Sequence, residues 1–388
     1  MDFQELIAKK VVALKPSGIR KFFDLLETME DAISLGVGEP DFATPWHIRD
    51  AGIYSLEKGF TKYTPNAGMM ALREEISRYM RRRFNLSYDP AGQIIVTVGG
   101  SEGIDLSLRM LLEPGDEVII PTPSFVCYGP LTVMAGGTPV YVETRAEDDF
   151  KLTPELLKSA LTEKTKVLVL PYPCNPTGGV MERADLEAVG EILKDTRVAV
   201  ISDEIYAELS YGLHHVSPAN IPALYDRTIV VNGFSKAYAM TGWRMGYLCG
   251  PRAAIAQMVK IHQFGIMSAP TTSQYAAIEA MRAGDRDIEA MRAEYDRRRR
   301  FLVHGLRDAG LDCYEPHGAF YVFPSIRSTG LSSEEFCERF LLSQRVAVIP
   351  GSAFGPGGEG FVRMCYAAGM ENLKEALARL ETFLKELA

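Results

Sequence analysis

The sequence predicts an α/β fold: a large domain with a mostly parallel seven-stranded sheet flanked by helices, plus a smaller α+β domain. Three observations support this prediction. Short, almost continuously apolar runs alternate with helical patterns, which is typical of parallel strands buried on both faces. The 388 residues exceed the roughly 150 expected of one domain. After about residue 285 the pattern changes to a long charged helix and short strands.

The predicted strands are short runs rich in β-branched residues, and their apolar residues are nearly continuous. They are Gln93–Val98, Glu117–Pro121, Pro139–Glu143, Val167–Leu170, Val198–Ser202, Thr228–Asn232 and Met245–Cys249. Helical periodicity lies between several of them, as in Ile104–Leu112, where four apolar residues share one face.

The domain boundaries follow from the change of pattern. Residues 46–285 are predicted to form the large domain, and residues 1–45 with 286–388 the small one. The small domain is expected to contain helices Asp287–Ala309 and Asn372–Leu387, with short strands in AFYVFPSI, RVAVIPG and FVRMCYA.

Composition and charge exclude several classes of protein. There are 42 Lys and Arg against 50 Asp and Glu, so the net charge of −8 argues against a nucleic-acid binder. The clusters Arg81–Arg83 and Arg297–Arg300 are interpreted as solvated helix faces. No apolar run is long enough to span a membrane, and the start MDFQELIAKK lacks an export signal, which predicts a cytoplasmic protein. Scattered cysteines and histidines predict no metal site.

The segment VVNGFSKAYAMTGWRMGY (230–247) contains the strongest chemical signal. A buried strand leads directly to Ser235 and Lys236, and a lysine at the mouth of a strand favours Schiff-base chemistry, because a partly desolvated amine is nucleophilic near neutral pH. Ser235 and Arg244 combine a hydroxyl with a guanidinium, which suits a phosphate. A surface lysine is the alternative if the pair is taken alone.

Two further strand ends carry polar residues. Asp203 ends the run VAVIS, and Tyr206 follows three residues later. Asn175 follows the run VLVL in PYPCNPTGG, where its amide can point into a site. Carboxyl ends of strands are where α/β sheets gather ligands. The structural alternatives are a helix N-cap for Asp203 and an ordinary Asn-Pro turn for Asn175.

A strand, a glycine loop and a helix follow one another in IIVTVGGSEGIDLSLRMLL. The backbone N–H groups around Gly100, Ser101 and Glu102 suit a phosphate at a helix N-terminus, with the Glu102 side chain pointing elsewhere. GGSEG also fits the nucleophile elbow of α/β-hydrolases, with Ser101 as nucleophile and His262, His304 or His317 as base. That alternative leaves Lys236 and Asp203 unexplained.

Taken together, these segments resemble class I, fold-type I aminotransferases that use pyridoxal 5'-phosphate. The matching segments run in order along nearly the whole chain: LGVGEPDF (35–42), YTPNAG (63–68), CNPTGG (174–179), SDEIY (202–206), SKAYAMTGWRMGY (235–247) and FVRMCYA (361–367). SGIRKFFDL (17–25), PTPSFVCYGP (121–130) and AVIPGSAFG (347–355) are closest to the aromatic and aspartate aminotransferase subgroup.

The resemblance implies a role for each site residue. Lys236 would bind the cofactor aldehyde as a Schiff base and move the proton between the substrate Cα and the cofactor C4'. Asp203 would pair with the pyridine nitrogen, and Asn175 and Tyr206 would bind the phenolic oxygen. Phe125 would stack on the ring. The phosphate would be held by Gly100, Ser101, Glu102, Ser235 and Arg244.

The resemblance also implies the substrate contacts and the assembly. Arg363 would bind the substrate α-carboxylate, with the Gly38 backbone and Asn175 nearby. Tyr63 would reach the cofactor phosphate of a neighbouring subunit, which implies a homodimer with composite sites. The structural alternatives are an exposed strand charge and an ordinary loop aromatic.

The expected reaction moves an amino group from an L-amino acid, aromatic first and aspartate next, to a 2-oxo acid such as 2-oxoglutarate. Arg20 is a candidate for binding a side-chain carboxylate. A pyridoxal-phosphate-dependent C–S β-lyase is the alternative, because the same cofactor site serves that chemistry. A cofactor-binding transcription regulator is disfavoured, since only 37 residues precede Gly38.

Overall fold

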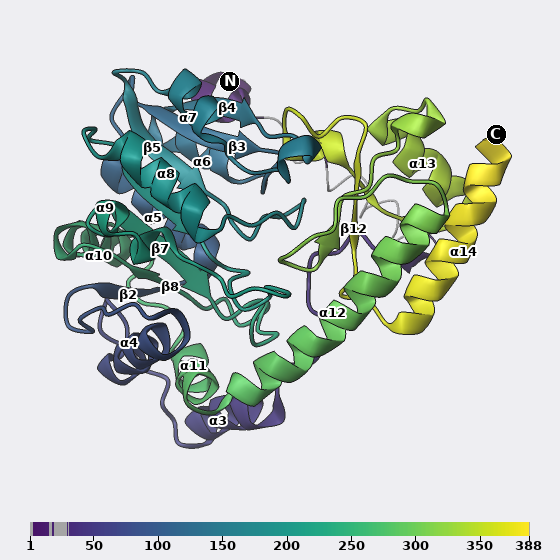
Figure 1. The fold of residues 1–388 in the computed structure, drawn as a ribbon. Coiled ribbons are helices and arrows are strands. Elements are labelled where there is room, and N and C mark those ends of the chain that lie inside the picture. The colour runs from purple at the N-terminus through teal and green to yellow at the C-terminus, as the bar shows by residue number, and fades with distance from the viewer. Residues whose placement is uncertain (1–2, 15–17, 19–28, 30, 388) are drawn as a thin grey trace.

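The structure, a computed structural model, describes residues 3–14, 18, 29 and 31–387. It consists of a larger part around a central sheet and a smaller part to its side (Figure 1). No helix among these residues is both long and apolar enough to cross a membrane. The same residues contain no group of three or more His, Cys, Asp or Glu arranged to hold a metal ion.

The central sheet confirms the predicted fold class. Its seven strands run in the order β2-β8-β7-β6-β5-β3-β4, and every pair is parallel except those that β8 forms with β2 and β7. The strands are β2 (Ile94–Thr97), β3 (Glu117–Thr122), β4 (Thr138–Glu143), β5 (Thr165–Leu170), β6 (Ala199–Asp203), β7 (Thr228–Gly233) and β8 (Gly246–Cys249).

Helices cover both faces of this sheet because its strands are apolar on both sides. Val118 and Ile120 of β3 pack in one core with α5, α6 and α10, whereas Ile119 between them packs in the opposite core with α7, α8 and α9. These helices are α5 (Gly99–Leu111), α6 (Tyr128–Ala135), α7 (Pro154–Ala160), α8 (Arg183–Leu193), α9 (Pro222–Tyr225) and α10 (Arg252–Gly265). A third core joins the sheet to α3 (Trp46–Glu57), α4 (Met70–Phe84) and α11 (Thr271–Ala283).

The smaller part has its own antiparallel sheet, in the order β11-β12-β9. Its strands are β9 (Tyr321–Val322), β11 (Ile349–Pro350) and β12 (Val362–Cys365), and its helices are α12 (Asp285–Asp308), α13 (Ser333–Gln344) and α14 (Met370–Leu387). Strand β1 (Ile33–Ser34) pairs with β10 (Val346–Ala347), so this N-terminal strand packs with the C-terminal part. Helix α1 (Lys9–Val12) lies against α6 instead. The boundaries at residues 45 and 285 stay a prediction.

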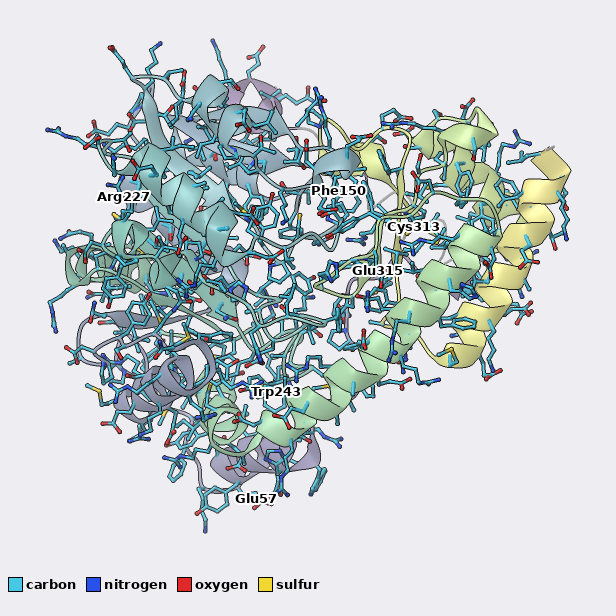
Figure 2. All side chains as sticks on the ribbon, in the orientation of Figure 1. Glu57, Phe150, Arg227, Trp243, Cys313 and Glu315 are labelled. Atoms are coloured by element: carbon cyan, nitrogen blue, oxygen red, sulfur yellow. The ribbon has the colours of Figure 1, made fainter. Side chains whose placement is uncertain are left out.

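Helix α12 and an aromatic cluster join the two parts. The helix contacts α11 of the larger part and α14 and β9 of the smaller one (Figure 1). Phe150, from the segment after β4, meets the rings of Tyr314, Phe323 and Phe361 edge-on. Figure 2 shows Phe150 where the two parts of the molecule meet. Aromatic side chains thus fill part of the junction between the two parts.

Helix α5 begins at Gly99, close to the helix N-terminus expected around Gly100, Ser101 and Glu102. The Glu102 carboxylate accepts a hydrogen bond from the Val98 N–H and supports this glycine-rich first turn. One local expectation was wrong. Arg298 and Arg299 do not lie on a solvated face, since each is only 6% exposed. Arg298 bonds to Asp41, and Arg299 bonds to the segment after α12, so both join α12 to its neighbours.

Candidate active site

A cavity of about 380 Å³ lies where the carboxyl ends of the central parallel strands meet the small sheet. Polar residues collect there because the parallel strands all end at the same edge of the sheet. Eleven of the residues predicted for the site line this cavity: Gly38, Gly100, Ser101, Phe125, Asn175, Asp203, Tyr206, Ser235, Lys236, Arg244 and Arg363.

Lys236 and Asp203 line the same cavity from neighbouring strands. Lys236 follows β7, and its Nζ donates to the Gly38 carbonyl at 2.6 Å. Burial of this amine lowers its pKa to about 8, so a substantial fraction is unprotonated in mildly alkaline solution. Asp203, the last residue of β6, is buried, and burial raises the pKa of its carboxyl group. The nearby Lys236 charge acts in the opposite direction on that pKa.

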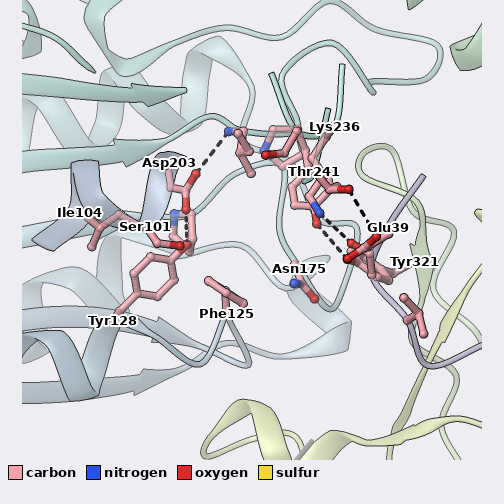
Figure 3. Close-up of a pocket in the computed structure, with 18 of the residues that line it drawn as sticks. Glu39, Ser101, Ile104, Phe125, Tyr128, Asn175, Asp203, Lys236, Thr241 and Tyr321 are labelled. Carbon is pink, nitrogen blue, oxygen red and sulfur yellow. Dashed lines mark hydrogen bonds between the residues drawn. The ribbon is translucent and has the colours of Figure 1, made fainter. Parts of the chain in front are cut away.

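A hydroxyl that the sequence analysis did not single out holds Asp203. Tyr128 Oη donates to Asp203 Oδ2 at 2.7 Å, and the Ile205 N–H donates to Oδ1 at 3.2 Å. Figure 3 shows Asp203 and Tyr128 at one end of the cavity and Tyr321 at the other, with Lys236 between them. The two hydrogen bonds stabilise the ionised carboxylate against the cost of burial.

The N-terminus of α5 and Arg244 bring several hydrogen-bond donors together at the cavity. Gly99 has a left-handed φ of 79°, and a Cβ there would lie 2.6 Å from Arg244 Nη2, so glycine lets the guanidinium approach the first turn. Ser101, in that turn, is exposed, and Ser235 is 8% exposed. Free N–H groups, hydroxyls and a guanidinium are the donors that a phosphate requires.

Glu102 does not line the cavity. Its carboxylate contacts the Val98 N–H and lies 2.7 Å from Nδ1 of the buried His262. The side chain therefore points away from the anion site, and the helix contributes its backbone there. None of the three histidines considered as the base of a hydrolase lines the cavity with Ser101. His262 is fully buried, His304 lies next to Asp308 on the exposed face of α12, and His317 is exposed.

Arg363, on β12, is 3% exposed and held from four directions. Its Nη1 donates to Asn175 Oδ1 at 2.8 Å, and its Nη2 donates to the Gly36 carbonyl at 2.6 Å. The guanidinium carbon lies over the rings of Tyr321 and Phe354, at 4.4 and 4.8 Å from the ring centroids. Within the described part of the chain its Nε has no hydrogen-bond partner, which leaves a donor for a ligand.

The structure also adds residues to the cavity and leaves others outside it. It is also lined by four residues that were not predicted for the site: Glu39, Tyr128, Thr241 and Tyr321. Each lies in a segment discussed above for other residues or for a predicted strand, and no pattern in the sequence distinguishes these four side chains from their neighbours. Tyr63 is 85% exposed and lines no part of this cavity, and Arg20 lies outside the described residues.

The comparisons with known proteins identify the family. The sequence profile of the family "Aminotransferase class I and II" matches residues 30–380, and the chain belongs to this family. It is an aminotransferase with the fold-type I architecture.

Individual relatives differ in their named substrates. The chain is 46% identical to an aspartate aminotransferase of Pyrococcus abyssi, covering 96% of this chain and 97% of the relative. It is 42% identical to aromatic-amino-acid aminotransferase 2 of Thermococcus litoralis, covering 98% of each. The solved structure of the Thermus thermophilus aspartate aminotransferase with maleate is 39% identical, with a TM-score of 0.92 over 97% of this chain and 99% of the other.

Proposed function

We propose that this aminotransferase holds pyridoxal 5'-phosphate on Lys236 and moves an amino group from an L-amino acid to a 2-oxo acid. The observation that carries the proposal is the position of Lys236 and Asp203 in one cavity, with the amine pKa lowered to about 8 by burial. An amine with this pKa is a nucleophile near neutral pH, which a Schiff base with an aldehyde requires.

The donors in the cavity fit this cofactor end to end. The α5 N-terminus with Ser101, Ser235 and Arg244 would hold its phosphate, and Asp203 would pair with its ring nitrogen. Phe125 is partly buried in the cavity wall and would face the ring. When bound, the cofactor supplies an electron-accepting ring that stabilises the electrons left at the substrate Cα.

The protein's own groups then hold and move protons. Asp203, whose ionised form the Tyr128 hydroxyl stabilises, would hold the ring nitrogen in its protonated form. Asn175 already accepts from Arg363 with its amide oxygen, so its amide NH₂ is the group that would donate to the phenolic oxygen, together with the Tyr206 hydroxyl. Lys236 Nζ, released from the cofactor by the substrate, would carry the proton between Cα and C4'.

Substrate binding is assigned to Arg363, whose planar guanidinium suits a carboxylate. We favour an aromatic donor, with aspartate next, and 2-oxoglutarate as acceptor; relatives named for aspartate and for aromatic amino acids support this range. A substrate with a second carboxylate would need another cation, and Arg20 is our candidate. We also propose a cytoplasmic location.

We further propose a homodimer in which Tyr63 completes the neighbouring cofactor site. Tyr63 and Phe264 are 85% and 88% exposed, and Asn66 Nδ2 donates to the Met267 carbonyl at 2.8 Å, so the two segments carrying these rings are joined. A partner subunit would cover this apolar surface.

A mixture of the Lys236→Ala and Tyr63→Ala variants tests the proposal. Hybrid dimers contain one intact site each and should recover about a quarter of wild-type activity. If the mixture recovers no activity, the proposal of a shared site is contradicted.

The main experiment follows the visible absorbance of the purified protein loaded with pyridoxal phosphate. Lys236→Ala should lose this absorbance and nearly all turnover, whereas the matched surface variant Lys260→Ala should keep both. Amino acids added one at a time identify donors by conversion of the bound cofactor to the pyridoxamine form.

Two further measurements test the alternatives. If Arg20→Ala uses dicarboxylic amino acids as well as the wild type does, Arg20 does not bind the substrate side chain. Release of pyruvate and ammonia from cysteine conjugates, without amino transfer, would favour a C–S β-lyase instead.

A further inference from the structure

Tyr321 lies between the residues proposed to bind the cofactor and those proposed to bind the substrate. It is the first residue of β9, it is 1% exposed, and it pairs with Cys365 of the neighbouring strand β12. Arg363 stands two residues before Cys365 on that strand, so the two side chains reach the cavity from adjacent strands. Figure 3 shows Tyr321 at the end of the cavity opposite Asp203.

The Tyr321 hydroxyl makes a hydrogen bond across the two parts of the molecule. Its Oη lies 2.8 Å from Tyr206 Oη, and the two rings meet edge-on with centroids 5.9 Å apart. Tyr206 comes from the segment after β6, so the bond joins the central sheet to the small sheet. Among the residues that the structure describes, Tyr206 Oη has no other hydrogen-bond partner.

The Tyr206 and Tyr321 hydroxyls each carry one proton, so the hydrogen bond between them can point in only two directions. A phenolic hydroxyl donates once and also accepts, so if Tyr321 donates to Tyr206, the proton of Tyr206 is free to point into the cavity. Hydrogen bonds in such a chain strengthen one another, so accepting from Tyr321 makes Tyr206 a better donor. The opposite direction would leave Tyr206 with no proton for a ligand.

The Tyr321 ring acts on the other group. Its centroid lies 4.4 Å from the Arg363 guanidinium carbon, and the centroid of the Phe354 ring lies 4.8 Å from the same carbon. Gly38 is what allows this placement, because a Cβ at that position would lie 2.4 Å from the Tyr321 hydroxyl oxygen. Stacking on an aromatic face holds a guanidinium in plane without using its N–H donors.

We propose that Tyr321 is a positioning residue with two separable actions. Its hydroxyl donates to Tyr206 and so commits the Tyr206 proton to the phenolic oxygen of the cofactor, while its ring fixes the plane of Arg363 for the substrate carboxylate. The inference rests on the proposed cofactor and on the proposed roles of Tyr206 and Arg363, and it adds a residue to them.

The hydroxyl is tested by a pH titration of the visible absorbance of the loaded protein. Hydrogen bonds that stabilise the ionised phenolic oxygen lower the midpoint of this titration. Tyr321→Phe should therefore raise the midpoint by about half a pH unit to one pH unit, and Tyr206→Phe by more. In the Tyr206→Phe background, the second substitution should produce no further rise, because the Tyr321 hydroxyl acts only through Tyr206. Tyr366→Phe is the control, since this buried hydroxyl donates to the Ala319 carbonyl outside the cavity.

The ring is tested by Tyr321→Leu, which should raise the KM for the amino acid about 5- to 30-fold above that of Tyr321→Phe. An unmoved midpoint in Tyr321→Phe, or an equal rise with and without Tyr206, would overturn the action of the hydroxyl. A KM within twofold of that of Tyr321→Phe would overturn the action of the ring. If the wild-type protein gains no visible absorbance from pyridoxal phosphate, the proposed function itself fails and this inference falls with it.

Discussion

The lowered pKa of Lys236 predicts how the stability of the cofactor-free protein depends on pH. Burial lowers this pKa from 10.5 to about 8, which corresponds to a cost of about 3 kcal/mol for holding the charged amine in the folded state. Below pH 8 both the folded and the unfolded chain carry the charge, so the whole cost is present. Between pH 8 and 10.5 the folded protein has released a proton that the unfolded chain still binds, so stability rises with pH.

The substitution Lys236→Met removes the amine and keeps a side chain of similar length. Removing the charged amine should contribute about 3 kcal/mol in favour of the variant at pH 7, and this contribution should disappear as the pH approaches 10.5. Loss of the hydrogen bond to the Gly38 carbonyl subtracts about 1 kcal/mol at every pH and leaves the pH dependence unchanged.

The measurement is urea unfolding of the cofactor-free proteins at one fixed protein concentration, from pH 6.5 to pH 10. Lys260→Met serves as the control, because Lys260 is exposed and bonds only to Gln257 in the described structure. Its difference from the wild type should stay near zero throughout. A Lys236→Met protein whose stability relative to the wild type is the same at pH 7 and pH 10 would refute the argument that burial lowers this pKa.

Three further changes test other parts of the site. Arg363→Lys should raise the KM for the amino acid about 100-fold, because an ammonium cannot bind a carboxylate with two parallel bonds; cofactor stoichiometry should not change, and a loss of cofactor would contradict the assignment. Arg244→Ala should weaken cofactor affinity about 10- to 100-fold by equilibrium dialysis, while Arg183→Ala, on an exposed surface, should leave it within twofold. Glu102→Gln should lower the free energy of unfolding by about 1–3 kcal/mol, because the amide has one acceptor oxygen where the carboxylate uses one for His262 and one for the Val98 N–H; equal urea midpoints would argue against these contacts.

Much of the fold was predictable because local sequence determines it. All seven central strands were expected within a few residues of their observed bounds, since buried parallel strands are recognisable as continuous apolar runs. The direction of β8 was not predictable: residues 234–245 bring the chain back beside β7, and no residue pattern distinguishes an antiparallel return from a parallel one. The N-terminus of α5 was expected close to Gly99, but the hydrogen bond that supports it, from the Val98 N–H to the Glu102 carboxylate, was not predictable from a glycine-rich segment of low helix propensity.

The site divides in the same way. Lys236, Asp203 and Asn175 were predictable as cavity residues because each follows a buried strand, and strand ends share one edge of the sheet. Tyr128 and Tyr321 were not, because a tyrosine with a buried hydroxyl looks like any core aromatic until its partner is known. Those partners, Asp203 and Tyr206, are 75 and 115 residues away in the chain.

Two hydrogen bonds between the parts of the molecule connect residues of the proposed substrate site to residues proposed to donate protons to the cofactor. Arg363 donates to Asn175, and Tyr321 and Tyr206 share a hydrogen bond; in each pair one residue faces the proposed cofactor and the other belongs to the small sheet. Because the Asn175 oxygen is engaged by Arg363, a substrate carboxylate that draws the guanidinium away also changes what the Asn175 amide offers to the phenolic oxygen. Arg363 and Tyr321 are in turn stacked on each other. Substitutions in the small sheet should therefore change the titration of the bound cofactor as well as the KM, although they touch neither Lys236 nor Asp203.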